Sequence, residues 1–342
     1  YTGGGCPHIL AEPQRTNLIT YSEDFSQSVW AKNNVSITSN STISPDGTQN
    51  ADTLTEDTSN STHFIQIQSI TITANIYSFS AYFKANGKNI VQIMGSNYFN
   101  SGTDGIFNLQ TETFVLGIRA TNGKIENVGN DWYRCSFTAS ENAFAGNNAH
   151  YRIYLGDGGT YTGDGTSGVF IYGAQLEEGS YPTSYIPTSG AGVTRNQDIF
   201  TRDGIGSLIN STEGVLFAEI AALANDGTYR EISLNDGTTN NVVEIRYTPT
   251  DNQFQFIIRN GGAAVVVESI TLSNALDFNK IAFSYKSNDY KMYVNGVQVA
   301  TDTSGAMPSG LNALSLEWGG NYFYGKVKQL QVYDTSLSDT QL

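Results

Sequence analysis

The chain has 342 residues, with 18 Lys or Arg and 32 Asp or Glu, so its formal net charge at pH 7 is −14. A field of that sign repels phosphate backbones and anionic headgroups, which argues against nucleic acid or a membrane surface as a partner. No apolar run approaches the roughly 18–20 residues of a spanning helix. Aromatic residues make up 12% of the chain, enough apolar surface to fold. We therefore expect a soluble, acidic, globular protein.

Alternating apolar and polar residues recur along the chain and predict an all-β protein. Residues 77–83 alternate cleanly, while in 65–72 the phase slips near Gln68-Ser69, which predicts a β-bulge. In 290–301, Asn295-Gly296 separates two apolar runs, a pattern typical of a hairpin with a type I′ turn. The spacing of such segments predicts two tandem antiparallel β-sandwiches, that is, jelly rolls.

A boundary between the two domains is indicated at residues 186–206. Pro182 and Pro187 flank a short segment, and the Gly-rich residues 189–192 then interrupt regular structure. We predict four regions: an N-terminal arm at 1–13, a first β-sandwich at 14–187, a linker at 188–206 and a second β-sandwich at 207–342.

Four stretches resemble known modules. CPHILAEPQRTNL at 6–18 and YGAQLEEGSYPTSYIPT at 172–188 resemble the two ends of a carbohydrate-binding jelly-roll module common in bacteriophage tail and virion proteins. KMYVNG at 291–296 and GKVKQLQVY at 325–333 resemble the laminin-G or concanavalin-A-like lectin fold. The resemblance implies a carbohydrate-binding module in the first domain and a lectin-like domain in the second.

These resemblances imply a non-catalytic, glycan-binding part of a phage virion, such as a tail or head fibre that contacts bacterial surface polysaccharide. Two other functions remain open: a structural decoration or assembly module, and an accessory binding region of a polysaccharide-degrading enzyme. We expect poly- or oligosaccharide and other virion subunits as partners, and a virion or extracellular location. A homo-oligomer is expected because linked weak sites gain avidity, and a trimer is the arrangement typical of fibres.

The residues that usually carry catalysis are scarce. The three histidines, His8, His63 and His150, are scattered, and no Ser lies in a G-x-S-x-G elbow. No run places carboxylates at alternating strand positions, and the adjacent Glu177 and Glu178 would point to opposite faces. We predict no catalytic residues and no enzyme.

Metal and cysteine patterns are equally sparse. The Gly- and Asp-rich loop 156–165 departs from a calcium loop at Gly159 and Tyr161. The resemblance implies a structural Ca²⁺ held by an acidic residue of the last strand, but that stretch reads Gly173-Ala174 here. We therefore assign no metal ligands and predict no cofactor, and a structural Ca²⁺ stays open as an alternative. Cys6 and Cys135 allow at most one disulfide, and Cys135 is expected to be a small buried residue.

Sugar binding needs only an exposed ring beside amide, carboxylate or guanidinium groups. Trp30 and Trp132 are expected in the core, while Trp318, before Gly319-Gly320, fits either core or surface. Better candidates are aromatic residues inside turn sequences, with nearby polar residues for the hydroxyl contacts. The predicted glycan-binding residues are Asn97, Tyr98, Asn100, Tyr161, Asp226, Tyr229, Asn321, Tyr322 and Tyr324.

Overall fold

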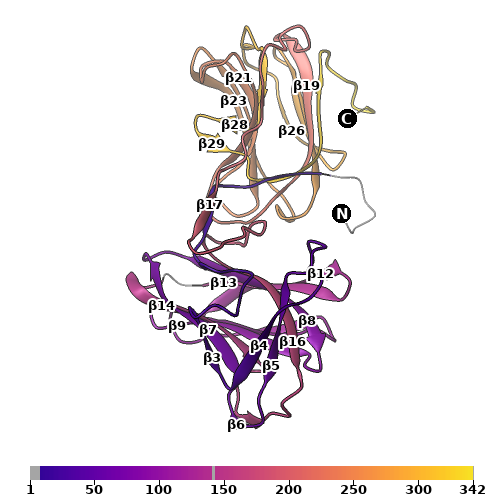
Figure 1. The fold of residues 1–342 in the computed structure, drawn as a ribbon. Helices are drawn as coiled ribbons and strands as arrows, with labels where there is room; N and C mark the ends of the chain where they lie inside the picture. Colours follow the sequence, from indigo (N-terminus) through magenta and orange to yellow (C-terminus); the bar gives the residue numbers. More distant parts are fainter. Residues whose placement is uncertain (1–7, 141–142, 342) are drawn as a thin grey trace. The chain divides into compact units, whose positions relative to one another are not determined.

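A computed structural model describes residues 8–140 and 143–341, which separate into two compact units. The first sandwich comprises residues 14–196, and the second comprises 8–13 together with 197–341. Both are built from antiparallel sheets (Figure 1), so the predicted all-β fold is confirmed. Within the described residues, no helix is long and apolar enough to cross a membrane.

The first sandwich consists of two six-stranded sheets. In spatial order, one sheet contains β11 (Thr113–Leu116), β10 (Asp104–Asn108), β9 (Ile90–Ser96), β14 (Gly146–Leu155), β7 (Phe64–Ile72) and β3 (Trp30–Asn33). The other contains β12 (Ala120–Gly129), β13 (Trp132–Ala139), β8 (Tyr77–Asn86), β16 (Gly168–Glu178), β5 (Ala51–Glu56) and β4 (Val35–Thr42). Two small pairs complete it, β2 (Arg15–Asn17) with β17 (Val193–Arg195) and β6 (Asn60–Ser61) with β15 (Tyr161–Thr162).

The core of the first sandwich confirms the alternation read from the sequence. Phe79 is fully buried and stacks on Phe137 with ring centroids 4.8 Å apart. The predicted bulge is present: pairing between β7 and β14 shifts register between Ile67 and Ile70, and Ser69 has a φ of 60°. Trp30, Trp132 and Cys135 are also buried, as expected, whereas Cys6 lies outside the described residues.

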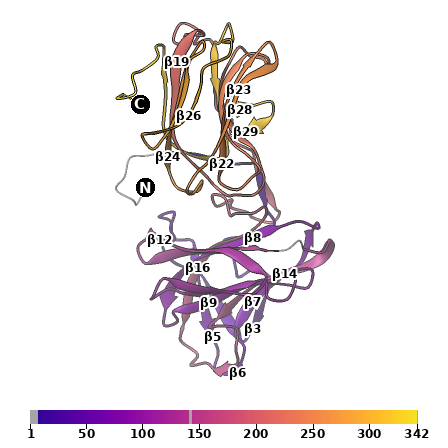
Figure 2. The ribbon, with the colours of Figure 1, turned by 180° about the vertical axis from the view of Figure 1, so that it is seen from behind.

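The second sandwich also consists of two six-stranded sheets, which Figure 2 shows as two layers. One contains β1 (Ile9–Ala11), β30 (Gly325–Tyr333), β19 (Glu213–Ala222), β24 (Asn279–Lys286), β25 (Tyr290–Val294) and β26 (Val297–Asp302). The other contains β18 (Thr201–Arg202), β27 (Ala313–Ser315), β20 (Arg230–Asn235), β21 (Val242–Tyr247), β22 (Gln253–Asn260) and β23 (Ala263–Thr271). A separate hairpin is formed by β28 (Glu317–Trp318) and β29 (Asn321–Tyr322).

The predicted hairpin between β25 and β26 is confirmed. Val294 pairs with Val297 across the two-residue turn, and both Asn295 and Gly296 have positive φ, 52° and 79°. A type I′ turn requires that conformation at both central positions.

The chain does not run through the two sandwiches strictly in tandem. Ile9–Ala11, expected in an N-terminal arm, pair with residues 325–327 of β30 as the edge strand of the second sandwich. The expected linker is also partly ordered into strands: Val193–Arg195 pair with β2 of the first sandwich, and Thr201–Arg202 pair with β27 of the second. The first sandwich is therefore inserted between the first strand of the second sandwich and the rest of it.

Candidate functional site

The most distinctive polar surface is one face of the second sandwich. In β20, β21 and β22, alternate residues such as Ile232, Ile245 and Phe256 enter the core. Since side chains alternate along a strand, the intervening residues point the other way. We call this second set the outer face: Glu231, Ser233, Glu244, Arg246, Gln255 and Arg259.

Strand register brings opposite charges together on the outer face. Glu231 is the direct cross-strand partner of Arg246. The Nη1 atom of Arg246 lies 3.0 Å from Oε1 of Glu231 and 3.2 Å from Oε1 of Glu244. Its Nε donates to Oε1 of Gln255 at 2.9 Å. One guanidinium therefore serves two carboxylates.

Both glutamates are unusual acids because their side chains are completely buried. Burial raises the pKa of Glu231 and the pKa of Glu244 from 4.5 to about 7. The negative charge of Glu231 raises the pKa of Glu244 further, while Arg246 and Arg259 act in the opposite direction on both. The outer face thus holds two acids that keep their protons to a higher pH than an exposed glutamate does.

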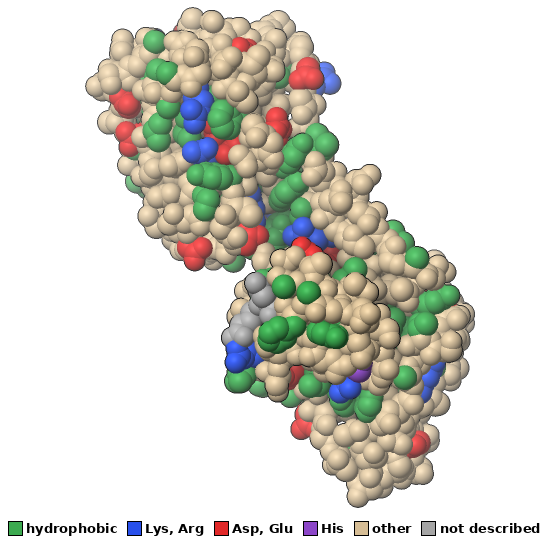
Figure 3. All heavy atoms as spheres, turned by 90° about the vertical axis from the view of Figure 1, so that its left-hand side faces the viewer, with side chains coloured by type: hydrophobic (Ala, Val, Ile, Leu, Met, Phe, Trp, Pro, Cys, Tyr) green, Lys and Arg blue, Asp and Glu red, His purple; other side chains and the backbone are tan. Residues whose placement is uncertain are grey.

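Two aromatic rings flank this charge network. The guanidinium carbon of Arg246 lies 4.6 Å from the ring centroid of Tyr229, and that of Arg259 lies 4.7 Å from the ring centroid of Trp318. Both distances fit cation–π contacts. Tyr229 is 39% exposed and Trp318 is partly exposed. Figure 3 looks onto the side where Figure 1 labels β28 and β29, and there basic side chains lie beside hydrophobic and acidic ones.

The hairpin of β28 and β29 borders the outer face. The Ser233 hydroxyl donates to the Glu317 carbonyl at 2.8 Å, which fixes β28 beside β20. The turn at Gly319 and Gly320 has φ values of 60° and 91°, which glycine adopts without strain. Asn321, on β29, lowers the pKa of Glu231 through a side-chain hydrogen bond.

The structure brings together some of the predicted residues of the second sandwich but not all. Tyr229 and Asn321 contact the outer-face charges. Tyr322 and Tyr324 stack on each other with centroids 6.0 Å apart. Asp226 instead forms an ion pair with Arg230 at 2.7 Å, so its carboxylate is already engaged.

In the first sandwich, the predicted residues around Tyr98 form no exposed ring platform. Tyr98 is partly buried and packs against the core, and a Cβ at Gly146 would lie only 2.3 Å from its ring. The Asn97 amide donates to the Asn148 carbonyl at 3.0 Å and contacts Nε2 of His150 at 2.9 Å. The Asn100 carbonyl accepts from the Thr103 amide in the same turn. These groups shape the loop itself.

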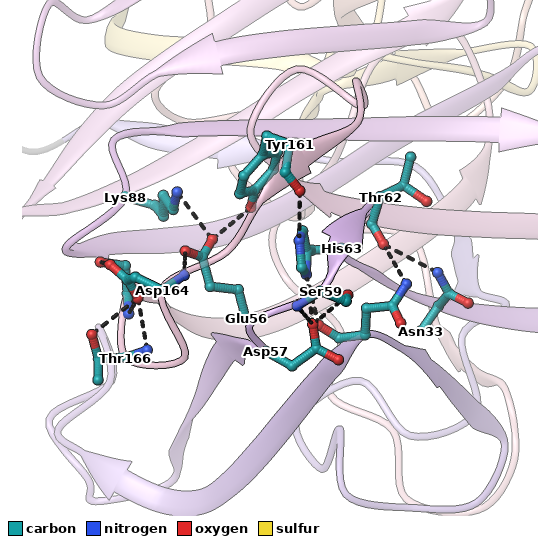
Figure 4. Close-up of polar contacts among 12 residues, drawn as sticks. Asn33, Glu56, Asp57, Ser59, Thr62, His63, Lys88, Tyr161, Asp164 and Thr166 are labelled. Atoms are coloured by element: carbon teal, nitrogen blue, oxygen red, sulfur yellow. Dashed lines mark hydrogen bonds and ion pairs between the residues drawn. The ribbon is translucent and has the colours of Figure 1, made fainter.

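Tyr161 is also held by its neighbours (Figure 4). Its hydroxyl donates to Oε2 of Glu56 at 2.6 Å, and burial together with this bond raises its pKa well above the usual range. The Lys88 ammonium lies 4.3 Å from the Tyr161 ring centroid and 3.0 Å from Glu56. The His63 ring centroid is 4.6 Å away. These contacts occupy the ring surface that a sugar would need.

The first sandwich also contains an acidic hollow of about 390 Å³, lined in part by Asp24 and Asp52. Asp52 accepts from the backbone amides of Phe25 and Asn40, both at 2.9 Å. Asp24 accepts from Ser26 and from Gln27. Across residues 8–140 and 143–341, no three His, Cys, Asp or Glu side chains lie close enough to hold a metal ion.

The sequence reading missed the acids and arginines of the outer face. Glu231 and Glu244 lie on neighbouring strands, so a search for carboxylates along one strand does not find them. They are fully buried with Arg246 between them.

A family model matches part of the second sandwich. Residues 220–342 match the family model described as the concanavalin A-like lectin/glucanases superfamily. That range contains the whole outer face and its hairpin. No curated protein matches the chain.

Several solved structures resemble parts of the chain. The CBM40 module of a Ruminococcus gnavus sialidase, solved with α2,3-sialyllactose, is 17% identical and covers 42% of this chain and 96% of its own, with a TM-score of 0.34. Sheep galectin-11 is 8% identical and covers 40% and 99%, with a TM-score of 0.31. Domains LG4-5 of the mouse laminin α1 chain are 10% identical and cover 80% and 86%, with a TM-score of 0.27.

Proposed function

We propose that this chain is a non-catalytic glycan-binding protein and that the outer face of the second sandwich contacts the sugar. The observation that carries the proposal is the exposed ring of Tyr229, fixed against Arg246 beside the partly exposed Trp318. A pyranose offers an apolar C–H face and a rim of hydroxyls, so ring and guanidinium together match both parts. The match of this region to a lectin and glucanase superfamily supports the same assignment.

The arrangement of the buried acids supports a binding role over a hydrolytic one. Glu231 and Glu244 are both paired with one guanidinium, that of Arg246, whereas the two carboxyl groups of a hydrolytic pair lie on either side of the bond that they cleave. Sugar hydroxyls exchange bonds with water for bonds with protein at little net gain, so each site is expected to bind weakly.

Resemblance of the first sandwich to a phage virion module supports a setting on a virion, facing bacterial surface polysaccharide. Repeated copies in a homo-oligomer, a trimer in our proposal, would compensate for weak sites, since linkage raises avidity by roughly 10²–10⁴-fold. Other virion subunits are then the second class of partner.

The test is binding of the full chain to a glycan array, followed by affinity measurement on the glycans that bind. Tyr229→Ala should weaken binding about five- to tenfold, equivalent to roughly 1 kcal/mol. Tyr333→Ala is the matched control, because Tyr333 is 38% exposed but lies on β30, in the other sheet. Binding that is absent from the wild type, or equally weakened by both variants, would overturn the proposal. A stable oligomer without sugar affinity would favour the decoration module instead.

A further inference from the structure

Besides Glu231 through its Oε2, three side chains on or beside the outer face carry buried polar atoms without a hydrogen-bond partner. The atoms are both carboxylate oxygens of Glu244, Nε of Arg259 and Nε1 of Trp318, each with almost no exposed surface. Oε1 of Glu244 lies 3.2 Å from Nη1 of Arg246, whereas Oε2 has neither a hydrogen-bond partner nor an ion-pair partner. Buried polar groups are nearly always paired, because an unpaired one costs about 1–3 kcal/mol. A concentration of such atoms therefore indicates that something else completes the site.

The three side chains are neighbours. Glu244 pairs with Ile257 across the ladder and Arg259 pairs with Val242, so Glu244 and Arg259 are diagonal neighbours on one face. The Arg259 guanidinium in turn lies 4.7 Å from the centre of the Trp318 ring. The set therefore offers one carboxylate acceptor beside two N–H donors.

We infer that Glu244, Arg259 and Trp318 form a subsite for two neighbouring hydroxyl groups of a neutral sugar. The inference rests on the proposed glycan-binding function and names the chemistry that the site selects. A hydroxyl both donates and accepts, so one hydroxyl donates to Glu244 while the pair accepts from Arg259 Nε and Trp318 Nε1. A site that buries such groups discriminates strongly against ligands without matching hydroxyls, since they leave its atoms unpaired.

The charges around the subsite select a neutral ligand over an anionic one. Arg246 is already shared between Glu231 and Glu244, so it has no uncompensated charge to offer. When both acids are ionised, the two carboxylates balance Arg246 and Arg259, so the site offers no net positive charge to offset the desolvation of a sugar carboxylate. The net charge of −14 acts in the same direction at longer range.

A ligand could reach these atoms only if Arg259 and Trp318 turned outward, because each atom has almost no exposed surface. Both side chains are partly exposed, and a Cβ added at Gly319 or Gly320 in the adjoining turn would meet no atom within 4 Å. Entry thus requires separation of one cation–π pair and leaves the strands in place. Trp318 must change its surroundings when the subsite fills.

Tryptophan emission reports this change selectively. Trp30 and Trp132 are 0% and 1% exposed and belong to the first sandwich, so Trp318 is the one tryptophan that solvent and ligand reach. The full chain is titrated with amylose, mannan and galactan, each beside a derivative whose C6 hydroxyl is oxidised to a carboxylate. We expect a saturable emission change with at least one neutral polymer and binding of its oxidised form at least tenfold weaker.

Two variants test the named atoms. Glu244→Gln replaces one of the two carboxylate oxygens by an NH₂ donor and removes the charge, so it should weaken binding of the neutral polymer about tenfold, while Trp318→Phe should remove the emission change. Glu268→Gln is the matched control, since Glu268 lies on β23 opposite Phe256, on the other side of the sheet from Glu244. Affinity that Glu244→Gln leaves unchanged would overturn the subsite.

The outcomes separate this inference from the proposed function. Oxidised polymers that bind as tightly as neutral ones would refute the inference and leave glycan binding intact. The same holds for a glycan that binds on the array without changing Trp318 emission. If no glycan binds on the array or in solution, both the inference and the proposed function fall.

Discussion

Replacing Glu244 by Gln should make the stability of the protein less dependent on pH. The pKa of Glu231 and that of Glu244 are raised from 4.5 to about 7 by burial, so between these values the folded state holds protons that the unfolded chain has released. The stability that these two acids contribute is therefore full below about pH 4.5 and is lost as the pH rises through 7. Glu244→Gln permanently supplies the neutral form that burial favours.

The size of the effect follows from proton linkage. One proton retained by the folded state changes the free energy of unfolding by about 1.4 kcal/mol per pH unit. Over the interval from about pH 4.5 to about 7, one retained proton amounts to about 3 kcal/mol. Arg246 is paired with both acids. Replacing Glu244 by Gln leaves this guanidinium to Glu231 alone and removes the free-energy cost of ionising Glu244 in the folded state. We expect the variant to be about 1–3 kcal/mol more stable than wild type at pH 8 and within about 1 kcal/mol of it at pH 4.5.

Urea unfolding of wild type and variant at several values from pH 4.5 to pH 8.5 measures this difference. Asp46 and Asp164 have lowered pKa values, so their contribution is instead lost at acidic pH; it is common to both proteins and cancels in the difference. Glu268→Gln controls for the loss of a carboxylate elsewhere in the same sheet. A difference between Glu244→Gln and wild type that stays constant across the range would refute the reasoning.

Three further predictions concern the fold. Phe79→Ala should cost about 3–5 kcal/mol, because it opens a cavity where Phe79 stacks on Phe137; calorimetry that shows a loss below about 1 kcal/mol would contradict this. In a Cys6→Ser background, Cys135 should react with a thiol reagent only on unfolding, because burial raises its pKa and removes its exposure; fast labelling of the native protein would disprove it. Deleting residues 1–13 should destabilise the second sandwich by about 2–4 kcal/mol through the loss of the β1 ladder, seen as faster hydrogen exchange in β30; unchanged exchange there would contradict it.

The parts of the fold that could be predicted are those that depend on neighbouring residues. Alternation in 77–83, the slip near Ser69 and the Asn295-Gly296 turn each express a local rule, and each is present in the structure. The strand at Ile9–Ala11 could not be predicted in the same way. It has three residues, and its partner lies more than 300 positions away in the chain. Pairing at that distance leaves no periodic signal.

The candidate site shows the same division. Tyr229 and Asn321 were found because an aromatic or amide residue in a turn sequence is locally visible. Glu231 and Arg246 were missed because their contact depends on the register between β20 and β21. Tyr98 satisfied the local rule equally well, yet Gly146 on another strand receives its ring. Only the folded structure distinguishes an exposed aromatic ring from one that packs against a neighbouring strand.

Because the first sandwich is inserted into the sequence of the second, the sugar-binding roles of the two cannot be separated simply by cutting the chain between them. The strands at the entry to and exit from the first sandwich, β2 and β17, pair antiparallel, which brings its ends together as insertion into another domain requires. In the second sandwich, the Glu12 amide donates to Asp198 at 2.9 Å, so residues before and after the insertion also meet there. A fragment that begins at residue 207 would lack β1, β18 and this contact. Loss of sugar binding in such a fragment would therefore report damage to the second sandwich as readily as a site in the first, and substitutions in the full chain are the sharper test.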